Sequence, residues 1–214
     1  MIPRIIHYIW FGNPLKKPAE RINKWKEVLI GWDFKEWTEK ELDVNDYLYT
    51  KAAYDLGLYG ICIDPFRPKI LLDHGGVWLD TDVNVHRDFS NLLDCSLLLG
   101  RHPMEGINVG VIGAKARHPL LQDLVDEYKD KWNFSPIAIT AAMFAVQYSR
   151  FAPELMYMRA LKKRYGISTP PPVRDLSTED GVLRIRDALE LSIVGKFNPE
   201  LNYTEHLQER SWQR

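Results

Sequence analysis

Segments typical of β-strands alternate with segments typical of helices along this chain, and this alternation limits the fold more than any other feature. The strand-like runs are short and rich in β-branched and aromatic residues, whereas the helix-like runs repeat apolar residues every three or four positions. Strand-like runs cover residues 4–11, 34–37, 77–79 and 107–114, and helix-like runs cover residues 18–32, 45–60, 118–132, 136–149 and 152–166. This order predicts an α/β fold with a sheet flanked by helices.

Two further segments carry local signals. Thr38 and Glu41 have the spacing of a capping box, which marks the start of a helix. Residues 168–181 are too rich in Pro, Ser and Asp for regular structure, and we expect a surface loop there. The residues after that loop are too few for an independent core, so the 214 residues are expected to form a single domain.

Composition excludes several classes of function. The net charge is −1, so no overall basic field recruits nucleic acid. Cys62 and Cys95 lie in apolar surroundings and are expected to be buried, reduced thiols, which favours a cytoplasmic location. The apolar residues 1–12 are too few for a signal peptide, and the longest uncharged run, residues 134–149, falls short of a membrane span. These features predict a soluble protein, and they leave peripheral membrane association open.

Two aspartates, Asp80 and Asp82, follow the apolar run at residues 77–79, which is entered through Gly75 and Gly76. Three interpretations fit this triplet alone. The aspartates could simply form a turn, a setting that Asp favours. They could be the nucleophile and the acid/base of an aspartyl-phosphate phosphatase, although Asn84 departs from that pattern. They could also bind a divalent cation that bridges a diphosphate, because hard carboxylate oxygens suit such ions.

Five segments taken in order resemble the D-x-D-containing glycosyltransferases of the capsular-polysaccharide and initiating mannosyltransferase type, distant relatives of the glucosylating clostridial toxins. The resemblance is carried by I-P-R-I-I-H-Y-I-W-F-G, by the W-K…E-W-T-E segment, by D-P-F-R followed by G-G-V-W-L-D-T-D, by N-V-G-V-I-G-A-K-A-R-H-P, and by the closing H-L-Q-E-R-S-W. It covers residues 2 to about 130 and a short C-terminal match. The order of the opening strand, D-x-x-R and G-G-x-x-L-D-x-D makes the signal specific.

The resemblance implies a GT-A-type fold, a mainly parallel sheet between helices that binds a nucleotide-diphosphate sugar at the carboxyl ends of its strands. It implies transfer with retention of anomeric configuration and a divalent metal, Mn²⁺ or Mg²⁺, with a UDP-sugar favoured over a GDP-sugar. Ile9 would hold the nucleobase through its backbone and Trp10 by stacking, although Trp10 could equally be a core aromatic. Asp64 and Arg67 match the D-x-x-R pair and would contact ribose and sugar hydroxyls.

The same resemblance assigns the metal and the sugar environment. Asp82 would ligate the metal directly, and Asp80 would act through the ribose and metal-bound water. Asn108 would lie near the donor sugar, or would merely satisfy a turn at a strand edge. Two departures matter: Ile63 replaces the usual Ser before Asp64, and Pro68 biases Arg67 away from helical geometry. We therefore expect the helix to begin only at Lys69, in which case Asp64 and Arg67 need not share a face.

The C-terminus by itself is a polar tail, for which disorder is the default. His206, Ser211 and Trp212 match the family's closing H-x-x-x-x-S-W, which implies a lid over the bound donor. Either His206 or Ser211 would then contact the metal, and Trp212 would cover the leaving diphosphate. In this division residues 1–130 form the nucleotide-sugar-binding core, residues 131–200 a helical region on the acceptor side, and residues 201–214 the lid.

The predicted reaction passes through an oxocarbenium-like transition state with a diphosphate leaving group, and the acceptor is a saccharide or another hydroxyl compound. The family resemblance suggests attack on the donor's front face, with the donor phosphate helping to deprotonate the acceptor. Alternatives are phosphatase-type phosphoryl transfer and a non-catalytic nucleotide-sugar-binding protein. A transferase acting on DNA would need a basic groove, and the run Arg159, Lys162, Lys163 and Arg164 is more typical of a solvated helix face.

Overall fold

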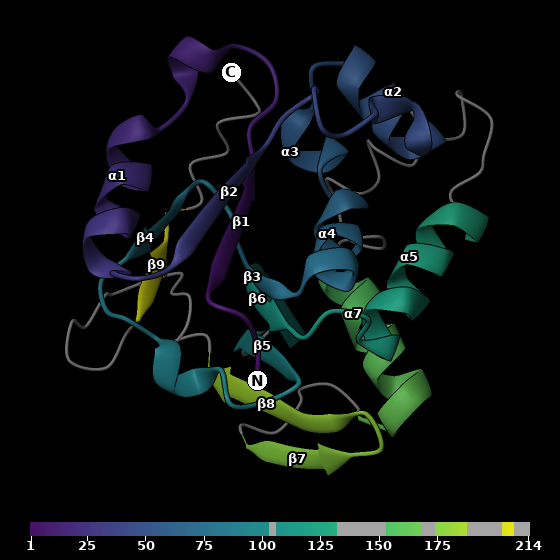
Figure 1. The fold of residues 1–214 in the computed structure, drawn as a ribbon. Helices are drawn as coiled ribbons and strands as arrows, with labels where there is room; N and C mark the ends of the chain where they lie inside the picture. Colours follow the sequence, from purple (N-terminus) through teal and green to yellow (C-terminus); the bar gives the residue numbers. More distant parts are fainter. Residues whose placement is uncertain (103–105, 132–152, 168–173, 188–202, 208–214) are drawn as a thin grey trace.

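The computed structural model describes residues 1–102, 106–131, 153–167, 174–187 and 203–207 (Figure 1). Seven strands of this part form one sheet in the order β2-β1-β3-β6-β5-β8-β7, and β4 pairs with β9 in a second. The strands are β1 (Ile5–Ile9), β2 (Asp33–Trp37), β3 (Gly76–Leu79), β4 (Val83–Val85), β5 (Leu97–His102), β6 (Gly106–Ala114), β7 (Asp175–Thr178), β8 (Gly181–Asp187) and β9 (Thr204–His206). The helices are α1 (Ala19–Val28), α2 (Leu48–Asp55), α3 (Tyr59–Cys62), α4 (Phe66–His74), α5 (Pro119–Lys131) and α7 (Pro153–Tyr165), with 3-10 turns η1 (Pro14–Lys16), η2 (Val44–Asp46) and η3 (Ser90–Leu92).

The main sheet is mixed but mostly runs in one direction. β1 is parallel to β2 and β3, and β8 is parallel to β5. β6 lies antiparallel to both β3 and β5, and β7 lies antiparallel to β8. Five of the seven strands (β1, β2, β3, β5 and β8) therefore point the same way, and two (β6 and β7) point the opposite way. The predicted α/β architecture with a mainly parallel sheet is confirmed.

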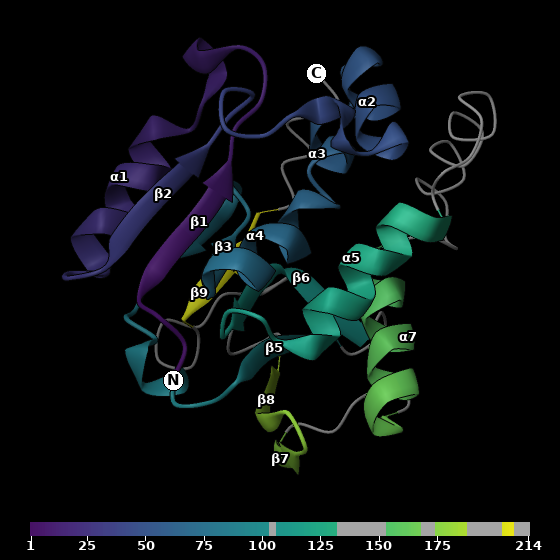
Figure 2. The same cartoon turned by 45° about the vertical axis from the view of Figure 1, so that its right-hand side comes forward.

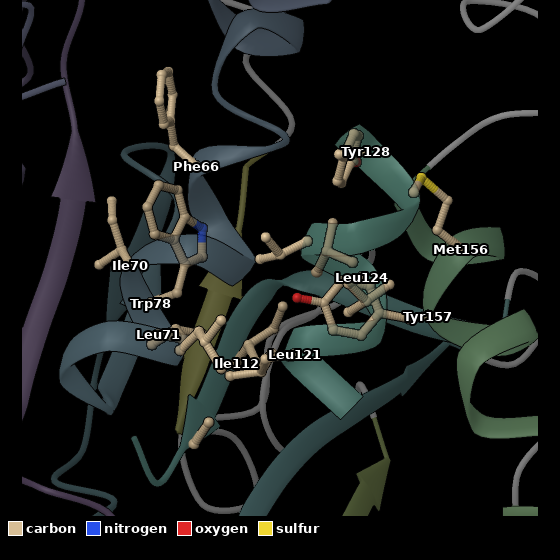
Figure 3. Close-up of a cluster of buried hydrophobic side chains, with 14 of the residues drawn as sticks. Phe66, Ile70, Leu71, Trp78, Ile112, Leu121, Leu124, Tyr128, Met156 and Tyr157 are labelled. Carbon is tan, nitrogen blue, oxygen red and sulfur yellow. The ribbon is translucent and has the colours of Figure 1, made fainter. Parts of the chain in front are cut away.

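Helices lie on both faces of this sheet (Figure 1 and Figure 2). α1 packs on one face, and α4, α5 and α7 pack on the other. Because side chains alternate along a strand, β3 sends residues into both cores. Val77 and Leu79 join the cluster that contains Trp25 of α1, whereas Trp78 joins the cluster formed with the opposite helices. Figure 3 shows that second cluster, where Trp78 lies near Phe66 and Ile70 of α4.

The local sequence signals had mixed outcomes. Glu41 accepts a hydrogen bond from the backbone N–H of Thr38, which is one half of a capping box, but the N–H of Glu41 bonds to the Thr38 carbonyl and residues 39–42 form only a turn. The surface-loop prediction for residues 168–181 is wrong over Asp175–Thr178, which form the edge strand β7. Pairing with β8 satisfies the backbone there, and β8 itself had no distinct pattern in the sequence. The predicted helix at residues 136–149 lies outside the described residues.

The prediction that Pro68 delays the helix to Lys69 is also wrong. α4 begins at Phe66, and the backbone N–H of Arg67 already bonds to the carbonyl of Ile63 at 3.2 Å. Pro68 is the third residue of α4, where a backbone N–H has no partner within the helix, so its missing donor costs little. Arg67 and Asp64 consequently lie on one side of the helix start and form an ion pair.

Both cysteines are buried and unpaired, as expected. Among the described residues, no helix combines the length and apolar character that crossing a bilayer requires. The basic run on α7 is partly neutralised, because Arg159 pairs with Glu127 and Arg164 pairs with Asp123 and Asp180. This pairing fits the solvated-face interpretation of that run.

Candidate active site

Two glycines place β3 beside β1. Gly75 ends α4 with φ of 65°, and Gly76 opens β3 with φ of 96°, a backbone region that side chains disfavour. A Cβ at Gly76 would lie 2.7 Å from the carbonyl oxygen of Ile5, and one at Gly75 would lie 2.7 Å from the backbone nitrogen of Ala116. Only glycine fits both positions, so this pair brings the end of α4 directly against the sheet.

The Asp80-Thr81-Asp82 triplet forms a turn at the carboxyl end of β3. The backbone N–H of Asp80 bonds to the carbonyl of Gly110 at 2.9 Å, and the N–H of Val83 closes the turn on the carbonyl of Asp80 at 3.0 Å. All three residues of the triplet are half-buried. The turn therefore lies where open α/β sheets place ligands, at the carboxyl edge of parallel strands.

Arg67 bridges two of the predicted site carboxylates. Its Nη1 lies 3.3 Å from Oδ1 of Asp64, and its Nη2 lies 3.2 Å from Oδ1 of Asp80. The same Asp80 oxygen accepts a 2.7 Å hydrogen bond from Nε1 of Trp78, whose ring lies below the guanidinium at 5.2 Å. Tyr49 donates to the other oxygen of Asp64 at 3.4 Å. The sequence-predicted residues Asp64, Arg67 and Asp80 thus form one connected cluster.

Burial makes this cluster electrostatically strong. The side chains of Arg67 and Asp64 are 4% and 7% exposed, so their charges interact with little solvent screening. Burial alone would lower the pKa of the Arg67 guanidinium, but Asp80 and Asp64 outweigh it and raise the pKa above its ordinary value. Arg67 thus pairs directly with Asp64 and Asp80, and Asp82 adds a third carboxylate two residues further along the turn.

Ile9 and Trp10 lie at the same edge of the sheet. β1 pairs in parallel with β3, and continuing their register places Ile9 level with Asp80. Ile9 is buried, whereas Trp10 is half-buried and belongs to neither apolar core. The backbone N–H of Trp10 bonds to Trp37, and its indole Nε1 donates to the carbonyl of Asn13 at 3.0 Å. The ring is therefore held in place outside the two apolar cores, and its role in stacking on a nucleobase stays a prediction.

Asn108 lies on β6 beside the turn and is 7% exposed. Its Oδ1 accepts a 2.8 Å hydrogen bond from the backbone N–H of Gly110, whose carbonyl in turn accepts from Asp80. The β5–β6 register shifts at this point: Leu99 pairs with Ile112, but the next residue, Gly100, pairs with Asn108. Asn108 therefore supports the backbone that carries Asp80, in agreement with the strand-edge role that the sequence left open.

The C-terminal segment reaches the same turn. β9 pairs antiparallel with β4, which follows Asp82 directly, and His206 lies opposite Val83. The backbone N–H of Leu207 bonds to the carbonyl of Asp82 at 2.9 Å. The side chain of His206, and all of Ser211 and Trp212, lie outside the described part. Residues 204–206 of the predicted lid segment, 201–214, thus form a strand anchored beside Asp82.

The donor set at the turn is compatible with a divalent cation. Asp80 and Asp82 offer hard carboxylate oxygens, although one oxygen of Asp80 already accepts from Arg67 and Trp78. Within the described ranges, no group of three or more His, Cys, Asp or Glu side chains could hold a metal ion. The two aspartates could supply two ligands of a divalent cation, and the other predicted ligands, the His206 side chain and Ser211, lie outside the described residues.

Sequence reasoning missed several residues that shape the site. Arg21 and Trp25 of α1 contact the backbone of residues 81 and 83, and Glu205 contacts Asn84. The sequence indicated Trp25 only as an apolar helix position and as the Trp of the W-K segment in the family resemblance, with no contact to the turn. The hydroxyl of Tyr157, on α7, is buried without a hydrogen-bond partner, and Arg67 influences its pKa (Figure 3). The residues in these contacts are separated by up to 121 positions in the sequence, and no local sequence pattern predicts such contacts.

Comparison with known proteins agrees with this geometry. Over 77% of the chain, the structure resembles the PaToxG glycosyltransferase, with a TM-score of 0.54 and 14% identity, covering 70% of that protein. The chain has the GT-A fold. No family model matches the sequence.

Two curated relatives are glycosyltransferases by name. The chain is 30% identical over 131 residues to inositol phosphoceramide mannosyltransferase 3 of Schizosaccharomyces pombe, covering 58% of this chain and 36% of that protein. It is 26% identical over 133 residues to an uncharacterized glycosyltransferase of Acanthamoeba polyphaga mimivirus, covering 56% of this chain and 53% of that protein. The chain spans between about a third and a half of the length of these relatives. The similarities support a glycosyltransferase family.

Proposed function

We propose that this protein transfers a glycosyl group from a nucleotide-diphosphate sugar to a hydroxyl acceptor, with a divalent cation and with retention of configuration. The observation that carries the proposal is the cluster of Asp64, Arg67 and Asp80 beside the Asp80–Asp82 turn, at the carboxyl edge of a GT-A sheet. The names of the sequence relatives support the same class of reaction. They give no support to phosphoryl transfer.

Different residues of the chain would bind the nucleobase, the ribose and the sugar of the donor. Trp10, a half-buried side chain fixed through Asn13, would stack its ring on the nucleobase, and the backbone at Ile9 lies next to it. Arg67 holds Asp64 and Asp80 through its two Nη atoms, so those carboxylates are oriented before the donor arrives. The carboxylate oxygens that do not contact Arg67 would accept hydrogen bonds from ribose and sugar hydroxyls, with Tyr49 already donating to that of Asp64. Preorganised groups of this kind lower the cost of binding, because little reorders when the donor arrives.

Asp82 and Asp80 would hold Mn²⁺ or Mg²⁺, with His206 or Ser211 completing the ligand set. When bound, the cation neutralises charge on the diphosphate as it leaves. Trp212 would cover the diphosphate and exclude water. We propose a UDP-sugar as the donor in preference to a GDP-sugar. This preference follows from the family resemblance alone.

The acceptor is a saccharide or another hydroxyl compound. The Schizosaccharomyces relative is named for inositol phosphoceramide, so a glycolipid headgroup is one acceptor class to include in assays. Such an acceptor would bring the protein to a membrane surface in the peripheral manner that the sequence left open. Nucleic acid has no such support, since the net charge is −1 and the basic run on α7 is partly paired.

A panel of nucleotide sugars tests this proposal. Hydrolysis or transfer is measured with Mn²⁺ and with excess chelator, and the anomeric configuration of the first product is read by NMR. We expect the wild-type protein to use one nucleotide sugar of the panel as donor, and to do so only in the presence of Mn²⁺. Turnover at the full rate in chelator would remove the metal from the proposal, and an inverted product would remove retention.

Asp82→Asn is the matched variant for the same assay. It keeps the shape of the side chain and removes the charge that a cation requires. We expect activity to fall by about a hundredfold or more, by analogy with the loss of a key electrostatic group. The melting temperature should stay close to that of the wild type, because Asp82 is half-buried at a turn. Asp88→Asn, an exposed change beyond β4, serves as the control and should retain full activity.

A further inference from the structure

The Asp80–Asp82 turn is held from behind by α1. Nη1 of Arg21 donates to the carbonyl of Thr81, the residue between the two aspartates, at 2.8 Å. Nε of the same arginine donates to Oδ1 of Asn84 at 3.1 Å. One helical turn later, Nε1 of Trp25 donates to the carbonyl of Val83 at 2.8 Å. α1 thus bonds to the backbone on both sides of Asp82.

The C-terminal strand holds the same segment from its other edge. Nδ2 of Asn84 donates to Oε2 of Glu205 at 3.1 Å, and Nε2 of His86 lies 3.3 Å from the same oxygen. Asn84 and Glu205 are directly opposite in the β4–β9 pair. The backbone N–H of Leu207 then bonds to Asp82 itself. A side-chain path and a backbone path therefore both lead from β9 to the D-x-D turn.

The charges of Arg21 and Glu205 fix one orientation of the hydrogen bonds that connect them through Asn84. The amide of Asn84 has a guanidinium at its oxygen and a carboxylate at its nitrogen, so only one orientation of the amide satisfies both neighbours. Hydrogen bonds to ionised groups are shorter and stronger than neutral ones. The side chain of Glu205 is 24% exposed, which limits competition from water. A rotation of the turn would break the Arg21–Thr81 bond and the Leu207–Asp82 bond together.

We propose that Arg21, Asn84 and Glu205 are positioning residues that set the conformation of the Asp80–Asp82 turn. Strand β9 is then part of the frame of the binding site, and it acts on the two aspartates even before the segment that follows it contacts a ligand. The consequence for cation and diphosphate binding rests on the proposed function. The conformational part stands without it.

Four variants distinguish an effect on the conformation of the Asp80–Asp82 turn from an effect on the stability of the whole fold. Glu205→Ala and Arg21→Ala break the side-chain path at its two ends. Glu205→Gln keeps an oxygen that can accept from Asn84 and serves as the conservative rescue. Glu20→Ala, next to Arg21 on α1, removes only an exposed ion pair with Lys24 and serves as the control. Amide hydrogen exchange at residues 80–86 reports the turn, and exchange at residues 6–9 and 77–79 reports the core.

Both alanine variants should speed exchange at residues 80–86 by about tenfold and leave the core amides unchanged. In calorimetry with Mn²⁺ and UDP as the probe, they should weaken binding by about tenfold, and Glu205→Gln by less than about threefold. Glu20→Ala should match the wild type in both measurements.

Unchanged exchange at residues 80–86 in both alanine variants would overturn the inference. Faster exchange with unaltered Mn²⁺ and UDP binding would also overturn it as a statement about ligand positioning. If the wild-type protein itself binds no Mn²⁺ with UDP and transfers no sugar, the proposed function fails. The exchange data then still decide whether Glu205 and Arg21 hold the turn.

Discussion

Arg67 combines the roles of structural support and site preparation in one side chain. It is nearly fully buried, yet it remains charged because Asp64 and Asp80 compensate the loss of solvent. Trp78 contributes from below, through its ring to Arg67 and through its indole N–H to Asp80. A buried guanidinium without its carboxylate partners would destabilise the folded protein. The buried carboxylates would destabilise it in the same way if the guanidinium were removed.

Arg67→Ala should therefore destabilise the fold as well as remove activity. Asp64 and Asp80 both lose an ion pair with the guanidinium, and breaking a buried pair in this way costs about 3–5 kcal/mol. The free energy of unfolding, measured in urea, checks this value. Lys69→Ala on the same helix removes an exposed ion pair with Asp73 and should cost less than about 1 kcal/mol. A loss for Arg67→Ala as small as that of the control would show that the cluster is well solvated.

At the scale of elements, the two short strands β4 and β9 matter most for the site. β4 begins at the residue after Asp82, so pairing with β9 brings residues 203–207 against the turn from more than a hundred positions away. Tyr203 adds to this attachment, since its carbonyl accepts from the N–H of His86 and its ring lies 4.5 Å from the guanidinium of Arg87. The pairing places residues 204–207, which belong to the predicted lid segment 201–214, against the turn.

Truncation after Leu207 separates β9 from the remaining residues of the predicted lid segment, 208–214. It retains β9 and the Leu207–Asp82 bond but removes Ser211 and Trp212, so the melting temperature should change by less than about 2 °C. Transfer should fall sharply, because water would enter and the leaving diphosphate would lose its cover. Calorimetric melting and the nucleotide-sugar assay measure the two effects separately.

Trp212→Ala is the milder companion to the truncation. We expect it to speed release of the donor while it leaves the fold intact. A truncated protein that transfers sugar at the full rate would show that residues 208–214 have no catalytic role. That result would leave the proposed role of the β4–β9 pairing unchanged.

At the scale of the whole molecule, two buried histidines link stability to pH. His7 on β1 is fully buried; its Nε2 lies 2.9 Å from the carbonyl of Gly75, and its Nδ1 accepts from the indole of Trp37. Burial lowers the pKa of His7 to about 4, with His74 and Lys35 contributing in the same direction. Burial also lowers the pKa of His118, ahead of α5, to about 4. Both imidazoles are therefore neutral in the folded protein at pH 6.

The folded protein should lose stability as the pH falls from about 6.5 to about 4. In that range the unfolded chain binds protons at these histidines and the folded chain does not, so lower pH favours unfolding. A shift of this size corresponds to about 3 kcal/mol for each histidine. Urea unfolding at a series of pH values measures the slope.

His7→Gln should reduce that slope by about half, since His118 remains. The glutamine oxygen can still accept from Trp37, so the comparison concerns the slope and not the absolute stability. The exposed His74 gives the control variant His74→Gln, which should keep most of the slope. An unchanged slope in His7→Gln would show that His7 titrates normally in the folded state.

The sequence by itself determined the α/β class, the first two strands, α1, α5, α7 and the strand that delivers Asp80 and Asp82. These elements carry their signals locally, in alternation, in three-and-four spacing and in the two glycines before β3. The D-x-D turn at a strand end was predictable for the same reason. Local signals failed at Thr38–Glu41, where one half of a capping box formed without a helix, and at Pro68, which the first turn of α4 accommodates.

Only the tertiary structure decided the surroundings of that turn. Whether Arg67 would lie on the surface or between Asp64 and Asp80 depended on the path of the chain from α3 into α4 and on Trp78 below it. β7 and β9 are short, polar strands whose backbone groups pair only because β8 and β4 offer an edge. Arg21 and Glu205 met at Asn84 for the same reason. Pairing between distant segments is fixed by the free energy of the whole packed sheet, which no single stretch of sequence contains.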